Sequence, residues 1–433
     1  MRSISVIASL VLAAWLYSLG MGPGAAWLDV WWWRREAILF SGVLSFTLMA
    51  WLMLLAMRPA WLEQRMGGLD RLYRMHRLAG YWAIGLGFAH YLLELAGPLL
   101  DMLVPHPGKG PKVERLFEAW RDSAKDLGEW SIWLLGLLLV LTLWQRFPYH
   151  LWRYAHRLLA PLFLLFAFHG VVLAPDNYWR QPLGLLIAAS ALLGSICALY
   201  SLTRRIGQSR GHTGQIVAMR ALADDVLEIT CQLQGHWRHQ PGQFAFIDFG
   251  GAEGAHPFTL SAADTGNACV RVAIKALGDH TRHLQHTLQV GQAVQVEGPY
   301  GAFTLPSAQL PNQHWIAAGI GVTPFLAWLE ALQGQPERAP QATLHYCVRN
   351  PAEDLFGQRL AQLCSSLPSI RLQVHYSDLQ GPLDGSTLLS EHPQGWPHLW
   401  FCGPQGLAEH LRRGLRQAGM PLAQFHQEAF RMR

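Results

Sequence analysis

The chain has 433 residues, of which 51% are hydrophobic and 15% are charged, and its formal net charge is +5. Ordinary soluble chains contain about 25% charged residues, and here the shortage is concentrated in residues 1–203, where long runs contain almost no acidic or basic side chains. This composition excludes a simple soluble enzyme, a disordered chain and a disulfide-rich secreted scaffold, and the mild charge without a basic stripe predicts no nucleic-acid partner.

The N-terminal half contains six apolar stretches of about the 20 residues that a membrane-spanning helix requires. They cover residues 4–20, 37–57, 77–100, 130–146, 151–173 and 181–202. The first stretch is also compatible with a signal peptide, because Arg2 precedes it and small residues follow at 24–26. Its length and the interface-like position of Trp27 favour a true span.

Basic residues in the short loops predict the orientation of these spans. Five arginines lie between the second and third spans, Arg146 and Arg153 lie between the fourth and fifth, and three arginines follow the sixth. All of these segments fall on one side, which predicts a multi-pass protein of the cell inner membrane whose C-terminal half is cytoplasmic. The six cysteines form no CxxC pair, and five lie in that half, which suits a reducing compartment.

The third and fifth spans each carry two histidines, His76 with His90 and His156 with His169. Their separations of 14 and 13 residues correspond to about 21 and 20 Å along a helix axis, so the histidines form two pairs at matching depths. Imidazole is a common axial ligand of haem iron. We interpret His76 with His156 as the inner ligands and His90 with His169 as the outer ligands of two stacked b-type haems. Separately packed histidines or a proton relay are the alternatives.

Helix rotation raises a difficulty for the second of these spans. On an ideal helix His76 and His90 would lie about 40° apart, whereas His156 and His169 would lie about 140° apart. Pro161 lies between the latter two histidines and predicts a kink. The sequence does not give the rotation that this kink supplies.

The C-terminal half changes to strand-like patterns from about residue 211. Short strands separated by Gly- and Pro-rich turns predict a small β-barrel that continues to about residue 306. Beyond it, strands and helices alternate, which predicts a parallel sheet. We therefore expect a six-helix transmembrane bundle over residues 1–205, a β-barrel domain over 206–308 and an α/β domain over 309–433.

Two turns of the α/β domain have the composition of dinucleotide-binding loops. The first contains Gly319, Gly321, Thr323 and Pro324 between a strand and a helix, and the second runs from Cys402 through Gly403 and Pro404 to Gly406. Glycine lets the backbone approach a diphosphate, and a helix N-terminus favours an anion. Both turns follow strands, so both can face one crevice at the carboxyl ends of the sheet.

Six short segments resemble, in order, the motifs of the NADPH oxidase and ferric reductase family. His256–Ser261 is similar to the flavin-binding HPFT motif. The other five segments are Pro241–Phe244, Lys275–Thr281, Glu297–Gly301, Gly319–Phe325 and Cys402–Gly406. The four histidines also match the haem ligands of this family, and the resemblance covers nearly the whole chain except the first span and residues 101–129. It implies a ferredoxin-reductase-like arrangement of the flavin and nucleotide domains.

The resemblance also implies roles for individual residues. The flavin ring is expected to contact His256, Pro257, Phe258 and Thr259, with Ser261 close by and Gly278 and Thr281 near the phosphates. Phe430 is the candidate for the C-terminal aromatic residue that stacks on the flavin, and a simple core position is the alternative. Cys402 is interpreted as a contact near the nicotinamide or as a small buried residue. Arg349 is the candidate partner of a 2′-phosphate, which favours NADPH over NADH, and surface solvation is the alternative.

One departure from the family concerns the electron acceptor. Where superoxide-forming members have a second histidine one turn after the outer ligand, this chain has Glu94, although Arg34 and Arg35 resemble the outer arginine of those enzymes. A carboxylate suits a metal cation better than superoxide. The alternative is a rim residue that contacts lipid headgroups.

For function, the resemblance implies a transmembrane oxidoreductase. Electrons would pass from cytosolic NADPH or NADH through FAD or FMN and two b-type haems to an acceptor outside the cytoplasm, either oxygen or a ferric or cupric ion. A redox module that supplies a periplasmic protein is one alternative. A histidine-based proton channel or transporter with a regulatory nucleotide domain is another.

Overall fold

The computed structural model describes residues 2–20, 29–106, 115–144, 146–203, 206–251, 254–390 and 396–427. The chain forms two compact units. Unit 1 consists of Met1–Glu63 and Arg71–Ile206, and unit 2 consists of Gln64–Asp70 and Gly207–Arg433.

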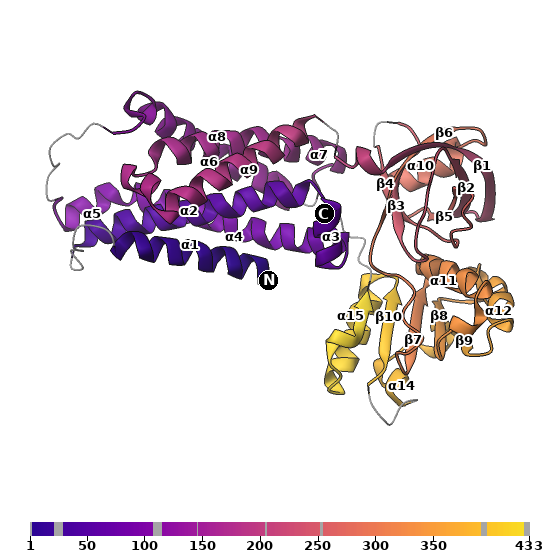
Figure 1. Cartoon of the computed structure of the whole chain (residues 1–433). Coiled ribbons are helices and arrows are strands. Elements are labelled where there is room, and N and C mark those ends of the chain that lie inside the picture. Colours follow the sequence, from indigo (N-terminus) through magenta and orange to yellow (C-terminus); the bar gives the residue numbers. More distant parts are fainter. Residues whose placement is uncertain are drawn as a thin grey trace. The chain divides into compact units, whose positions relative to one another are not determined.

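Unit 1 is a bundle of long helices that lie side by side (Figure 1). The long helices are α1 (Arg2–Gly20), α2 (Val30–Ala56), α4 (Leu69–Leu95), α6 (Arg121–Leu143), α8 (Leu159–Leu173) and α9 (Pro182–Leu202). The shorter helices are α3 (Ala60–Met66), α5 (Gly97–Leu103) and α7 (Tyr149–Arg157). In the described part of the chain, five helical segments are long and apolar enough to cross a membrane, or six if the bent pair of α4 and α5 is one span.

Several helices extend beyond the apolar stretches that predicted them. The helix α2 begins at Val30 rather than near residue 37, because the carboxylate of Asp29 caps it by accepting a hydrogen bond from the Trp31 amide at 2.9 Å. The helix α6 likewise begins at Arg121 rather than near residue 130. Both helices continue into charged residues, as is expected at the membrane interface. A hydropathy pattern marks only the apolar part of such a helix and therefore misses its ends.

The fifth predicted span is interrupted at one residue, Leu158, although Leu151–Leu173 still forms one candidate span. The helix α7 ends at Arg157 and α8 begins at Leu159. Pro161 has no amide hydrogen, so the bond to the Arg157 carbonyl that a continuous helix would contain is missing. The regular helical hydrogen bonds resume with the next residue, where the Leu162 amide donates to the Leu158 carbonyl at 3.1 Å. The break places His156 and His169 on two different helices.

The first part of unit 2 is an antiparallel barrel with the strand order β4-β3-β6-β1-β2-β5. Its strands are β1 (Gly211–Ala223), β2 (Val226–Leu233), β3 (Phe244–Asp248), β4 (His256–Thr259), β5 (Cys269–Lys275) and β6 (Ala293–Tyr300). A bridge between Leu260 and Val272 joins the end of β4 to β5 and closes the sheet. The core contains Trp237, Ile247 and Val296, each at most 2% exposed. The helix α10 (Asp279–Thr287) follows β5.

The second part of unit 2 is a parallel sheet with the order β11-β10-β7-β8-β9. Its strands are β7 (Gln313–Ala318), β8 (Ala342–Val348), β9 (Ile370–Tyr376), β10 (His398–Cys402) and β11 (Phe425–Gln427). Its helices are α11 (Thr323–Gln333), α12 (Gly357–Ser365), α13 (Ser377–Gln380), α14 (Gly385–Ser390) and α15 (Gln405–Gln417). The predicted fold class, an apolar helical region followed by a barrel and a parallel α/β domain, is confirmed.

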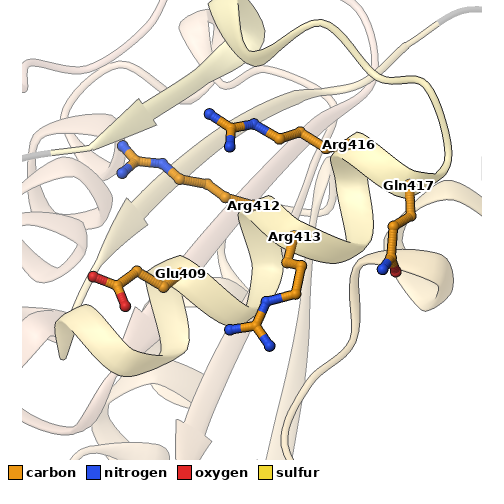
Figure 2. A pocket seen from close by; sticks show the side chains of 5 residues that line it. All are labelled: Glu409, Arg412, Arg413, Arg416 and Gln417. Carbon is orange, nitrogen blue, oxygen red and sulfur yellow. The ribbon is translucent and has the colours of Figure 1, made fainter.

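Helices cover both faces of this parallel sheet. On one face, Phe325 of α11 and Leu360 of α12 pack with Trp315. On the other face, Leu411 of α15 packs with Phe401. The opposite side of α15 is strongly basic, and Figure 2 shows a hollow lined by Glu409, Arg412, Arg413, Arg416 and Gln417.

A row of hydrogen-bonded histidines crosses the centre of the same sheet. The Nδ1 atom of His314 lies 2.8 Å from Nε2 of His345, and Nδ1 of His345 lies 3.2 Å from Nε2 of His375. His345 is fully buried. Burial lowers the pKa of His345 well below its ordinary value, and the neighbouring His314, His375 and Arg371 lower it further.

This row predicts that unit 2 loses stability in acid. His345 stays neutral in the folded chain while an unfolded histidine takes up a proton below about pH 6.5, so stability is complete above that pH and falls below it. We expect roughly 2 kcal/mol of loss between pH 6.5 and 5, measured as the thermal midpoint of unit 2 in the full chain. His345→Leu should flatten this dependence, and His410→Gln, a change at a half-exposed histidine, should leave it unchanged. The same dependence of the thermal midpoint on pH in the wild type and both variants would contradict the role of buried His345 in the acid sensitivity of unit 2.

Candidate functional site

The outer pair of predicted ligands comes together in unit 1. His90 on α4 and His169 on α8 have ring centroids 6.3 Å apart. Nδ1 of His90 lies 2.8 Å from the Ile38 carbonyl oxygen, and Nδ1 of His169 lies 2.8 Å from the Ala124 carbonyl oxygen. A carbonyl only accepts, so both Nδ1 atoms carry the hydrogen and both Nε2 atoms keep a lone pair. In this tautomer the lone pair of Nε2 is available to bind a metal.

Two glycines make room for these outer rings. A Cβ atom at Gly42 would lie 2.9 Å from Nδ1 of His90, and one at Gly128 would lie 2.2 Å from Nδ1 of His169. Any larger residue would force the ring away from the helix that binds it. The sequence analysis did not single out these glycines, although an isolated glycine in an apolar helix is a known signal of close packing.

The inner pair comes together in the same way. His76 on α4 and His156 on α7 have ring centroids 6.2 Å apart. Their Nδ1 atoms are buried; His76 has a backbone contact with Leu52, and Nδ1 of His156 has no hydrogen-bond partner within the described part of the chain. A buried polar atom without a partner costs free energy. The His156 ring is therefore less completely held by the protein alone than the two outer rings.

The spacing of both pairs fits a metal ion between two imidazoles. Two metal–nitrogen bonds of about 2.1 Å, with about 1.1 Å from each nitrogen to its ring centroid, place two axial imidazoles roughly 6.4 Å apart. The chain supplies its own contrast, because the hydrogen-bonded pairs His314–His345 and His345–His375 have centroids only 5.0 and 5.4 Å apart. The membrane histidines are thus too far apart for direct bonding and fit the spacing that a shared iron requires.

The predicted flavin residues lie around one end of the barrel. The strand β4 carries His256, Pro257, Phe258 and Thr259, and it is followed by the buried Ser261. The amide of Ser261 donates to the Arg271 carbonyl at 2.8 Å, and its hydroxyl donates to the same oxygen at 3.1 Å. These bonds hold the chain after β4 against β5.

The start of α10 approaches the same strand. The rings of His256 and His280 stack with centroids 3.8 Å apart. The hydroxyl oxygen of Thr281 accepts from the amides of Leu277 and Gly278 at 3.0 and 3.1 Å, which orders this turn. A Cβ atom at Gly278 would meet no atom within 4 Å, so space remains beside it. His280 was not singled out from the sequence, although it lies within the motif that was.

The two glycine turns of the parallel sheet touch each other. A Cβ atom at Gly321 would lie 2.3 Å from the Cys402 carbonyl oxygen, and one at Gly403 would lie 2.6 Å from Cβ of Ala318. Gly319 has φ near +54°, a left-handed conformation that favours glycine. The turns therefore meet at the carboxyl ends of the adjacent strands β7 and β10, where parallel sheets bind ligands.

The remaining predicted residues of this domain have mixed positions. Thr323 is buried at the start of α11 and donates to the Ile320 carbonyl at 3.2 Å, and Pro324 follows it inside the helix. Cys402 is 4% exposed and lies among the core residues of the sheet. Arg349 follows β8 with a largely exposed side chain and forms an ion pair with Glu353. Phe430 lies outside the described residues.

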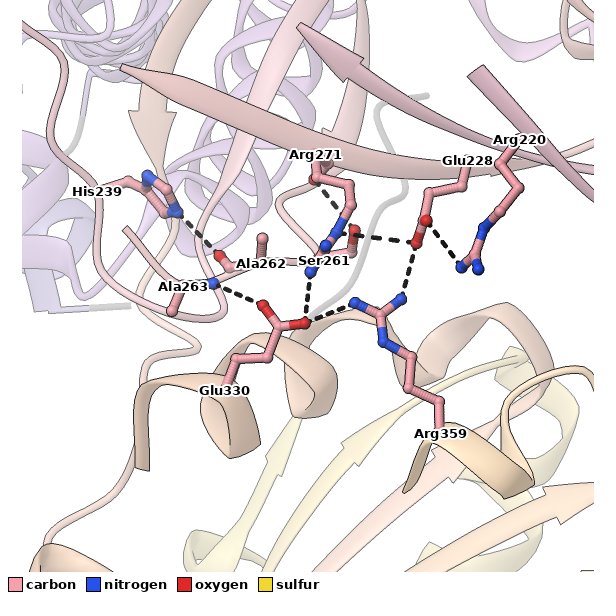
Figure 3. A network of polar contacts seen from close by, with 9 residues as sticks. All are labelled: Arg220, Glu228, His239, Ser261, Ala262, Ala263, Arg271, Glu330 and Arg359. Carbon is pink, nitrogen blue, oxygen red and sulfur yellow. Dashed lines mark hydrogen bonds and ion pairs between the residues drawn. The ribbon is translucent and has the colours of Figure 1, made fainter. Parts of the chain in front are cut away.

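A network of charged side chains joins the barrel to the parallel-sheet domain (Figure 3). Glu228 of β2 accepts from Arg220 at 3.0 Å and from Arg359 of α12 at 2.8 Å. Glu330 of α11 pairs with Arg271 of β5 and with Arg359. Each carboxylate thus receives charged donors from both domains.

The same network reaches the segment that follows the flavin strand. The Ala263 amide donates to Glu330 at 3.3 Å, and His239 donates from Nε2 to the Ala262 carbonyl at 3.0 Å. Ser261 lies immediately before these residues, and Glu330 lies on the helix that starts at the first glycine turn. The network therefore connects β4, which carries the predicted flavin residues, to the helix that follows the first glycine turn.

Three family models match the chain in order. A ferric reductase-like transmembrane component matches residues 41–167, an FAD-binding domain matches 212–304, and an oxidoreductase NAD-binding domain matches 315–413. These matches support a membrane protein with NAD(P)H-driven electron transfer.

Individual relatives match mainly one half. An NADPH oxidoreductase of Mycobacterium tuberculosis is 28% identical over 231 residues, which is 50% of this chain and 60% of that protein. The carnitine monooxygenase reductase subunit of Escherichia coli is 28% identical over 180 residues, which is 41% of this chain and 53% of that protein. The chain thus spans about half to three fifths of these relatives. A crystal structure of flavohemoglobin from Malassezia yamatoensis with bound FAD and heme is similar in fold alone, with 17% identity, 98% coverage of both chains and a TM-score of 0.50.

The charged network leads to a stability prediction. Glu330→Ala should destabilise unit 2 by about 2 kcal/mol, because it removes one of the two carboxylates that Arg271 and Arg359 share at a largely buried boundary and leaves only Glu228. Arg220→Ala is the matched control, since its side chain is 62% exposed and exposed ion pairs contribute less than about 1 kcal/mol. Thermal unfolding of the full-length variants measures both effects. Equal losses would show that the network does not join the two domains as described.

Proposed function

Because the chain belongs to the ferric reductase-like, NADPH oxidase-type oxidoreductases, we propose that it carries electrons from cytoplasmic NAD(P)H to an acceptor on the other side of the inner membrane. The observation that carries this proposal is the spacing of the two imidazole pairs, 6.2 and 6.3 Å between ring centroids. When bound, the nicotinamide, the flavin and two b-type haems supply the redox chemistry, and the protein holds and orients them.

In unit 2 the residues act by binding and orienting. The backbone at Gly319, Gly321 and Gly403 admits the diphosphate of the nucleotide, with Thr323, Pro324 and Pro404 shaping the two turns. His256, Pro257, Phe258 and Thr259 contact the flavin ring, with Ser261 beside them and Gly278 and Thr281 near its phosphates. Cys402 is the proposed contact near the nicotinamide, and Phe430, which lies outside the described residues, is the candidate to stack on the flavin. The charged network of Glu228, Glu330, Arg271 and Arg359 keeps the two binding surfaces in register.

In unit 1 the four histidines act as ligands. His90 and His169 present Nε2 because their Nδ1 atoms donate to helix carbonyls. His76 and His156 hold the inner haem, closer to the cytoplasmic side predicted from the arginine-rich loops. The two pairs lie along the same helices, α4 and the α7–α8 segment, so the residues of each pair would hold one haem and the two haems would supply one-electron redox chemistry at two depths of the membrane.

The acceptor is a small oxidant, either oxygen or a ferric or cupric ion. At the outer end of α4, Arg34 pairs with Glu94 at 3.2 Å, and the Glu94 side chain is 62% exposed. The pair neutralises the arginine that resembles the oxygen-site residue of superoxide-forming relatives. A second candidate function is electron supply to a separate protein, for which we propose a periplasmic partner; the relative from Escherichia coli, named as a reductase subunit of a monooxygenase, favours supply to another protein.

Anaerobic spectroscopy tests the proposal. Addition of NADPH to the detergent-purified protein should reduce the flavin and both haems, and the His90→Leu variant should retain only the inner haem. Admission of oxygen or of chelated ferric ion to the reduced sample then ranks the acceptors. A sample that reoxidises with neither would favour the periplasmic partner. A folded protein without haem bands would contradict the proposal.

The glycine contacts predict a selective loss of haem. Gly128→Ala should displace the His169 ring, because the added Cβ atom would lie 2.2 Å from its Nδ1 atom. We expect roughly half of the haem per protein to be lost, with the outer haem affected. Gly85→Ala on α4 is the matched control, since nothing lies within 4 Å of its Cβ position and it faces away from both His76 and His90. Equal haem content in the two variants would contradict the placement of the outer site.

Arg349 predicts the nucleotide preference. Arg349→Gln should raise KM for NADPH roughly tenfold, the value expected for loss of one charged contact to a phosphate. KM for NADH should be unchanged, because NADH has no 2′-phosphate. Steady-state reduction of an artificial acceptor measures both constants. An equal change for the two nucleotides would assign Arg349 to general stability through Glu353.

A further inference from the structure

The outer end of α4 is held by an arginine from α2. Arg34 donates from Nε to the Leu93 carbonyl at 2.9 Å and from Nη2 to the Glu94 carbonyl at 2.7 Å. These carbonyls lie three and four residues after His90, in the last turn of the helix, where intrahelical donors run out. The same helix α2 provides the Ile38 carbonyl for Nδ1 of His90.

The outer end of α8 is held in the same way by an arginine from α6. Arg121 donates from Nη1 to the Val172 carbonyl at 3.0 Å and from Nη2 to the Leu173 carbonyl at 3.4 Å. These carbonyls again lie three and four residues after a ligand, His169, in the last helical turn. The same helix α6 provides the Ala124 carbonyl for Nδ1 of His169.

The two helix pairs therefore repeat one arrangement with three parts. In each pair, a supporting helix contributes an arginine to two terminal carbonyls, a carbonyl to the imidazole and a glycine beneath the ring. The positions on the supporting helices are Arg34, Ile38 and Gly42 on α2 and Arg121, Ala124 and Gly128 on α6. Of the inner histidines, His76 has a backbone contact with Leu52 of α2, whereas Nδ1 of His156 has no hydrogen-bond partner within the described residues.

This arrangement fixes each ligand helix against sliding and rotation. A guanidinium group binds two carbonyls in one rigid geometry, and its bonds are stronger than neutral ones because the donor is charged. A cation at a helix C-terminus is favourable, and an arginine in a membrane helix is costly unless it is bound. A shift of either last turn would move the ring that lies one turn away.

We propose that Arg34 and Arg121 are positioning residues that set the ligand geometry and the affinity of the outer haem. The inference rests on the proposed function, because it requires a haem between His90 and His169. It extends that function by naming the arginines that hold the last turns of both outer ligand helices. The two arginines also differ in the charged groups around them. Glu94 neutralises Arg34 at 3.2 Å, whereas Arg121 forms no ion pair with any described residue.

The test compares Arg34→Gln and Arg121→Gln in the purified full-length protein by low-temperature electron paramagnetic resonance, redox titration and haem content. The low-spin signal of the outer haem should shift in both variants, and haem affinity at that site should fall roughly tenfold, as is usual when the support of a ligand is removed. The signal of the inner haem should not change, and it serves as an internal control. The midpoint potential of the outer haem should decrease in Arg121→Gln more than in Arg34→Gln, because only Arg121 carries an uncompensated charge.

Two further variants separate position from charge. Glu94→Gln removes the ion pair but leaves both carbonyl bonds of Arg34, so its outer signal should match the wild type. Lys125→Gln removes an exposed cation from the same helix as Arg121, and it should likewise match the wild type. If Glu94→Gln reproduces the effect of Arg34→Gln, the ion pair rather than the carbonyl contact is responsible and the inference is wrong.

The remaining outcomes are also decisive. An unchanged outer signal in both glutamine variants, or an equal change at both haems, would overturn the inference. Where a glutamine variant does not fold, Arg34→Lys and Arg121→Lys take its place. Lysine keeps the charge but is a point donor, so a shifted outer signal supports the inference and a wild-type signal overturns it. A wild-type protein without haem would instead refute the proposed function itself.

Discussion

The rest of the structure depends on the distance at which unit 1 holds its four histidines. Two imidazole pairs have centroids 6.2 and 6.3 Å apart, while hydrogen-bonded imidazoles elsewhere in the chain lie 5.0 and 5.4 Å apart. At 6.2 and 6.3 Å, the two imidazoles of each membrane pair are too far apart to form a hydrogen bond with each other. The break before Pro161, the glycines beneath the outer rings and the carbonyls at Nδ1 all serve to maintain this spacing.

Unit 2 solves a different problem, which is to keep two binding surfaces in register across a domain boundary. The glycine turns reach backbone contact, since a Cβ atom at Gly321 would lie 2.3 Å from the Cys402 carbonyl oxygen. The charged network links the barrel to α11, the helix that begins at the first of these turns. Charged groups at such a boundary tolerate little displacement, because each one would lose its partner in a partly dry environment. The arrangement is suited to hydride transfer, which requires fixed contact between two rings.

Much of this organisation could be predicted from the sequence, because it depends on local patterns. Apolar runs predicted the helical unit, strand periodicity predicted the barrel, and alternation of strands and helices predicted the parallel sheet. The depth of His76, His90, His156 and His169 followed from counting residues along helices. The angle of about 140° between His156 and His169 was a conflict that only the structure resolved, since its resolution depends on where the helix breaks. The two arginine contacts and the network of Glu228 and Arg359, 131 residues apart, join distant segments and have no local signature, whereas isolated glycines in apolar helices gave a signal that was not used.

The most direct measurement is the iron content of the purified protein, together with the low-temperature electron paramagnetic resonance spectrum of its oxidised form. The account predicts two haem irons per chain and two distinguishable low-spin signals, one of which disappears in His90→Leu and the other in His76→Leu. A chain that folds and binds flavin but contains one haem or none would contradict the central claim that each imidazole pair holds an iron.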